Sequence, residues 1–68
     1  MDNLTEAIIL GLQAQMDFME TARTRHLVWA DKAHKAEATV MHLEIASSYL
    51  QTRLQISRLL DNYREPSL

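Results

Sequence analysis

The sequence has no cysteine, a single glycine and a single proline among its 68 residues. A chain without thiols can form neither a disulfide scaffold nor a cysteine-based zinc site. Gly11 and Pro66 are the only strong helix breakers, and the turn-forming pairs Asn-Gly and Asp-Gly are absent. Because a β protein needs many more turns than these residues allow, the sequence predicts an all-α fold.

A strong charge of one sign and a long apolar run are also missing. The net charge of -2 at pH 7 is too small to indicate general attraction to nucleic acid or to a membrane. The apolar run at residues 7–12 is far shorter than the roughly 20 residues that cross a bilayer, and the acidic start around Asp2 and Glu6 is unlike a secretory signal. We therefore expect no membrane partner and a cytoplasmic location.

The chain is long enough for one domain only, residues 1–68. A protein of this size buries only roughly 60% of the surface that its unfolded chain exposes, so its stability is small unless something else contributes. Since disulfides are excluded, the usual contribution is a second protein chain. We expect a homodimer, an association with another protein, or both.

Helix-forming residues extend from about residue 3 to about residue 63. Asn3 and Glu6 have the spacing of a capping box at a helix N-terminus. Pro66 disfavours helix at the residue before it, so the helical segment is expected to end near Tyr63.

Charged and polar residues crowd between Asp31 and Glu37, and Asp31 is a suitable N-cap for a second helix. We predict a two-helix antiparallel hairpin, completed by self-association as in a four-helix bundle or by a partner protein. The alternative is a continuous coiled-coil rod about 90 Å long, whose heptad seam is weakened by Ala33 and Ala36. The hairpin elements are expected at about residues 3–30 (first helix), 30–35 (bend), 35–63 (second helix) and 64–68 (tail).

The second helical segment carries its apolar residues in two stripes. The first stripe consists of Ala36, Val40, Leu43, Ala46, Leu50 and Leu54. The second stripe, centred about 150° away around the helix, consists of Met41, Ile45, Tyr49, Ile56, Leu59, Leu60 and Tyr63. One neighbouring helix can cover one stripe, and tyrosine is enriched at interfaces, so the second stripe is predicted to bind a partner. Alternatively, one broad helix face covers parts of both stripes.

Basic residues gather around the expected bend. They are Arg23, Arg25, Lys32 and Lys35. Such a group can contact an acidic partner or nucleic acid, but no aromatic or glycine-rich recognition element accompanies it. Solvated charges beside a turn are the simpler interpretation, and nucleic acid is not expected to be the main partner.

Residues that could support chemistry do not form a recognisable site. The three histidines recur every eight residues, which places them on different faces of a helix. Asp31, His34 and Glu37 are spaced by three, but three exposed ligands without supporting contacts make a weak metal site. The serine, histidine and glutamate side chains within residues 42–48 share one helix and lack oxyanion donors. We expect no catalytic, cofactor or metal site and no enzymatic activity.

Together these features predict a non-catalytic protein-interaction module, a small regulator, adaptor or chaperone-like protein that binds, masks or inhibits a partner through an apolar helix face. In size and expected hairpin architecture the chain resembles the dimeric two-helix regulators of plasmid copy number and the small co-chaperones of type III secretion needle subunits. No sequence motif of either family is present. The alternatives are a small nucleic-acid-binding hairpin that uses the basic bend, and a structural coiled-coil rod.

Overall fold

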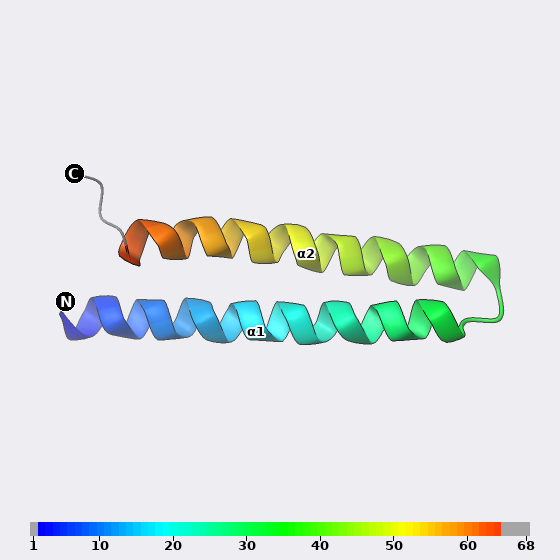
Figure 1. Ribbon diagram of the computed structural model, residues 1–68, viewed down its shortest axis with the longest axis horizontal. Coiled ribbons are helices and arrows are strands. Elements are labelled where there is room, and N and C mark those ends of the chain that lie inside the picture. The colour runs from blue at the N-terminus through cyan, green and yellow to red at the C-terminus, as the bar shows by residue number, and fades with distance from the viewer. Residues whose placement is uncertain (1, 65–68) are drawn as a thin grey trace.

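A computed structural model describes residues 2–64, which form two long α-helices packed side by side in opposite directions (Figure 1). Helix α1 spans Asn3–Lys32 and helix α2 spans Ala36–Arg64. The molecule measures 50 × 20 × 11 Å, because the chain folds back on itself instead of continuing as a single rod. The predicted all-α, two-helix hairpin is therefore confirmed.

The start of α1 differs from the expected capping box. The N-cap is Asp2, whose Oδ1 atom accepts a hydrogen bond of 2.6 Å from the backbone N–H of Thr5. Asn3 is the first helical residue, so its expected role as the cap is wrong by one position. The bond from Thr5 N–H stabilises the ionised carboxylate and lowers the pKa of Asp2.

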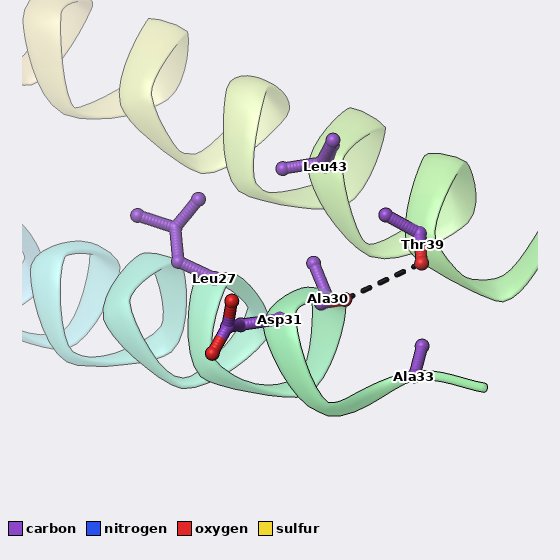
Figure 2. Close-up of a pocket in the computed structure, with 6 residues that line it drawn as sticks. All are labelled: Leu27, Ala30, Asp31, Ala33, Thr39 and Leu43. Carbon is purple, nitrogen blue, oxygen red and sulfur yellow. Dashed lines mark hydrogen bonds between the residues drawn. The ribbon is translucent and has the colours of Figure 1, made fainter. Parts of the chain in front are cut away.

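The bend is shorter than expected, because α1 continues through Asp31 to Lys32. Asp31 therefore does not cap α2. The chain turns within residues 33–35, where Ala33 adopts an extended conformation and its N–H lies 3.4 Å from the carbonyl oxygen of Ala30. The hydroxyl of Thr39 lies 3.3 Å from the same carbonyl oxygen, so the first turn of α2 is tied to the last turns of α1 (Figure 2).

The far end of α2 also extends slightly beyond the expected boundary, since Arg64 is still helical. Residues 65–68, the rest of the expected tail, lie outside the described residues. Neither α1 nor α2 contains a stretch that is apolar and long enough to cross a membrane.

The seam between the helices has a thin core. Its buried residues are Ile9, Ala30, Ala46 and Leu60. Between these positions the seam is lined by half-buried residues, several of them polar, including His26, His42 and Arg53.

The two helices lie close together at the bend and diverge toward the open end, where Asp2 and Arg64 lie (Figure 1). Small Ala30 is buried near the bend, whereas the larger Ile9 and Leu60 are buried nearer the open end. The size of the buried side chains therefore accounts for the taper of the hairpin.

Candidate protein-interaction surface

Helix α2 presents a row of large aliphatic side chains to solvent. Its members are separated by three, seven and four residues, so they lie on one side of the helix. We refer to Val40, Leu43, Leu50 and Leu54 as the apolar strip. Their exposed fractions are 53%, 47%, 38% and 47%, so α1 leaves about half of each residue uncovered.

The apolar strip is separate from the side of α2 that packs on α1. Contacts to α1 involve Thr39, His42 and Arg53, and Ala46 between them is buried. At 100° per residue, the strip is centred about 100° around the helix from this seam. A third helix could therefore pack on the strip without disturbing the hairpin.

The strip continues onto α1 close to the bend. Leu27 and Asp31 of α1 lie across a shallow groove from Leu43 and Thr39 of α2, with Ala30 on its floor (Figure 2). Leu27 is itself partly exposed. The groove therefore extends the aliphatic surface of the strip and places a carboxylate at its edge.

The sequence-predicted partner-binding residues separate into two groups. Ile45, Tyr49, Ile56 and Leu60 are half-buried or buried, and Tyr49 stacks on His26 of α1 at a ring centroid distance of 5.8 Å. These four residues serve the hairpin itself. The exposed members of the stripe are Met41, Leu59 and Tyr63.

Helix α1 thus covers parts of both predicted stripes. It covers Ala46 from the first stripe and most of the central residues of the second. This arrangement agrees with the alternative that one broad helix face covers parts of both stripes. Its consequence is that the longest uncovered aliphatic row comes from the first stripe.

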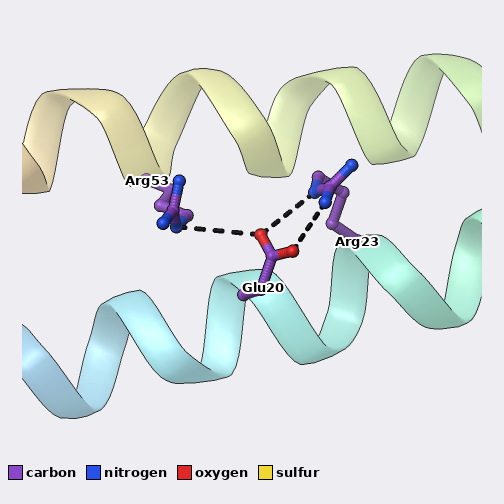
Figure 3. Close-up of polar contacts among 3 residues, drawn as sticks. All are labelled: Glu20, Arg23 and Arg53. Atoms are coloured by element: carbon purple, nitrogen blue, oxygen red, sulfur yellow. Dashed lines mark hydrogen bonds and ion pairs between the residues drawn. The ribbon is translucent and has the colours of Figure 1, made fainter.

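An ion cluster joins the helices in the middle of the seam (Figure 3). Glu20 accepts two hydrogen bonds from the guanidinium of Arg23, at 2.6 and 3.1 Å, and its Oε2 atom lies 3.7 Å from Nε of Arg53 on α2. The hydrogen bond from Arg23 lowers the pKa of Glu20, and the carboxylate raises the pKa of Arg23. All three side chains are partly exposed. We therefore expect this cluster to fix the alignment of α1 against α2 more than to raise the free energy of unfolding.

The four predicted basic residues do not form one patch. Arg23 is engaged by Glu20 and lies nine residues before the end of α1, about 14 Å along the helix. Arg25, Lys32 and Lys35 are exposed. Lys32 and Lys35 line a shallow groove at the bend together with Trp29 and His34.

Two histidines that are sixteen residues apart in the sequence meet across the seam. Nδ1 of His26 lies 2.9 Å from Nδ1 of His42. Trp29 packs edge-on against His26, with ring centroids 4.9 Å apart, and lies 5.6 Å from His42. The signal that could have found this pair is symmetry about the bend, since both histidines are eight residues from His34.

Among residues 2–64, no three histidine, aspartate or glutamate side chains come together as a potential metal site. The hairpin therefore does not bring Asp31, His34 and Glu37 together as a metal site.

No protein-family model, curated protein or solved structure matches this chain. We therefore infer the function from the surfaces of the chain itself.

Proposed function

We propose that the chain is a non-catalytic protein-interaction module that binds another protein chain through the apolar strip of α2. The observation that carries this proposal is the row of four aliphatic residues, each 38–53% exposed, beside a seam with little buried core. Single exposed apolar residues are normal on protein surfaces, but a continuous row marks an interaction site.

Covering the apolar strip with another protein chain is energetically favourable. Burying a leucine or valine side chain completely is worth about 1.5–3 kcal/mol relative to exposure. Since about half of each strip residue is exposed, covering the four is worth about 3–6 kcal/mol before the cost of association is subtracted. That gain is comparable with the whole stability of many domains of this size.

The polar residues near the strip support a role in binding instead of catalysis. His42 is engaged by His26, and the hydroxyl of Ser48 donates a hydrogen bond of 3.2 Å to the carbonyl oxygen of Glu44. Neither histidine nor serine is therefore placed to activate the other, as an acyl-transfer site requires. A cytoplasmic adaptor or regulator that masks or inhibits its partner fits such a surface.

The experiment that tests the proposal compares two substitutions that add the same charge. Leu50→Glu places a carboxylate within the strip, whereas Gln55→Glu places one on an exposed side of α2 away from it. We expect Leu50→Glu to abolish self-association of the chain and Gln55→Glu to leave self-association intact. Light scattering across a concentration series measures both. Circular dichroism checks that both variants remain helical.

An association that survives Leu50→Glu with its affinity unchanged would show that the strip is not the binding surface. Equal losses in the two variants would attribute the effect to net charge, and would also contradict the proposal.

A further inference from the structure

We infer that the chain bound to the apolar strip is a second copy of this protein, with the two α2 helices antiparallel across a two-fold axis beside Ser47. The inference rests on the proposed function and adds the identity and the orientation of the partner. It comes from the order of large, small and charged residues along the exposed side of α2.

The apolar strip reads nearly the same in both directions from Ser47. Val40 and Leu54 lie seven residues before and after it, and Leu43 and Leu50 lie four before and three after. In an antiparallel pair, Val40 therefore meets Leu54 of the second copy, and Leu43 meets Leu50. Every large side chain of the strip finds a large one opposite.

Ser47 occupies the centre of this row and is exposed. On a two-fold axis it packs against itself, and two small side chains allow the helix backbones to approach closely at the crossing point. The small residues Ala36 and Ser57 lie beyond the two ends of the strip, eleven and ten residues from Ser47. The contact is therefore about 21 Å long, and a small residue lies beyond each of its ends.

Charges beside the strip distinguish the antiparallel from the parallel arrangement. Glu37 lies ten residues before Ser47 and Arg58 lies eleven after it, and both are exposed on the solvent side of the strip. An antiparallel pair brings Glu37 next to Arg58 of the second copy at each end. A parallel pair would instead place the two solvent sides on opposite flanks of the contact, so Glu37 and Arg58 of the two copies would not meet and these attractive contacts would be lost.

These charges are not already used within the hairpin. In the part of the chain that the structure describes, the ion pairs involve Glu20, Arg23 and Arg53, and neither Glu37 nor Arg58 takes part in one. Glu44, three residues before Ser47, meets uncharged Gln51, four residues after it. Antiparallel pairing therefore creates two attractive contacts and no repulsive one along this edge.

Helix α1 offers a less continuous surface for a second copy. Its most exposed large residues are Leu4, Leu10 and Phe18. Leu4 and Phe18 are fourteen positions apart with Gly11 and Gln15 between them, and Leu10 lies about 80–120° around the helix from both. The strip of α2 has four large aliphatic residues on one side of the helix, which is why we assign the contact to α2.

A single cysteine tests the position of the axis. Because the chain has no natural cysteine, Ser47→Cys can form a disulfide only between two copies. Disulfides require Cα atoms about 4.4–6.8 Å apart, a distance that residues beside a two-fold helix crossing reach. The matched control is Ser48→Cys, which is equally exposed but is rotated by about 100° away from the strip.

Under mild oxidation at dilute concentration, we expect Ser47→Cys to form a disulfide-linked dimer much faster than Ser48→Cys. Equal rates for the two variants would overturn the antiparallel crossing at Ser47. Because both positions are exposed, neither substitution is expected to disturb the fold, and circular dichroism checks this.

Charge reversal tests orientation without a cysteine. Glu37→Arg alone and Arg58→Glu alone each remove two attractive contacts per dimer, and we expect either to raise the dimer dissociation constant about 2- to 30-fold. The double variant exchanges the charges and should restore the original constant. Absence of this rescue would contradict the antiparallel pairing.

The failures of the two proposals are distinguishable. If the chain stays monomeric at high concentration, a second copy is excluded as the partner. The inference about the second copy then fails, and the proposed function requires that a different protein binds the strip. If a dimer forms and Leu50→Glu does not dissociate it, both proposals fail. If Leu50→Glu dissociates the dimer but the cysteine and charge tests are negative, only the arrangement proposed for the two copies fails.

Discussion

His26 and His42 face each other across the two helices with their Nδ1 atoms 2.9 Å apart. A hydrogen bond between two ring nitrogens requires that one carries a proton and that the other has a free lone pair. Since Tyr49 stacks on His26, the hydrogen-bonded pair is part of the packing of the seam.

The first prediction is that the histidine pair stabilises the hairpin. His42→Ala removes the hydrogen-bond partner of His26 and the ring beside Trp29, in a seam with few buried residues. We therefore expect this substitution to lower the free energy of unfolding, because a partly buried hydrogen bond and aromatic contacts are lost.

The expected loss is about 1 kcal/mol or more, which lowers the melting temperature of a domain of this size by about 4–8 °C. Thermal unfolding followed by circular dichroism measures it. His34→Ala, at the exposed bend, is the control and should behave like the natural chain. Equal melting temperatures for His42→Ala and His34→Ala would show that the histidine pair does not stabilise the seam.

The second prediction separates the seam from the solvent side of α2 with two adjacent leucines. Leu60 is 3% exposed and Leu59 is 46% exposed. We expect Leu60→Ala to lower the free energy of unfolding by about 2 kcal/mol or more, and Leu59→Ala to lower it by about 0.5 kcal/mol or less. Urea unfolding measures both values, and losses of equal size would contradict the placement of Leu60 against α1.

The third prediction concerns the start of α1. Asp2→Ala removes the acceptor for Thr5 N–H and should lower the melting temperature at pH 7, whereas Asn3→Ala should have little effect. The pKa of Asp2 is lowered in the folded chain, so its contribution is present at neutral pH and is lost as the pH falls through that lowered value. A larger effect of Asn3→Ala would restore the capping box that the sequence suggested.

The fourth prediction is that Gly11→Ala stabilises the isolated chain. A Cβ atom at this position would meet no other atom within 4 Å, so no close approach of the two helices requires a glycine here. Alanine favours helix over glycine by about 1 kcal/mol, which corresponds to a gain of about 4–8 °C in melting temperature. Ala14→Gly, on the same helix, should produce the opposite change.

Should Gly11→Ala instead destabilise the protein, and do so more strongly at higher concentration, another chain must approach the helix at Gly11. The concentration dependence of the melting temperature separates that case from a local effect.

The hairpin could be predicted from the sequence because two helices follow from the scarcity of breakers and the bend follows from the polar cluster near Asp31. The side of α2 that faces α1 could not be predicted. Both stripes are apolar enough to pack, and the choice between them depends on how the helices are rotated and aligned. That alignment is set partly by polar contacts, such as His26 with His42 and Glu20 with Arg53, which the pattern of apolar residues does not reveal.

The tapered outline of the hairpin has a geometric consequence for any pair of copies. In a head-to-head pair the wide ends would meet at one end of the assembly, leaving the other end narrow. Reversing one copy about Ser47 sets the wide end of each wedge beside the narrow end of the other, so the two ends of the pair have the same outline. An irregular shape in the single chain thereby becomes a regular one in the pair.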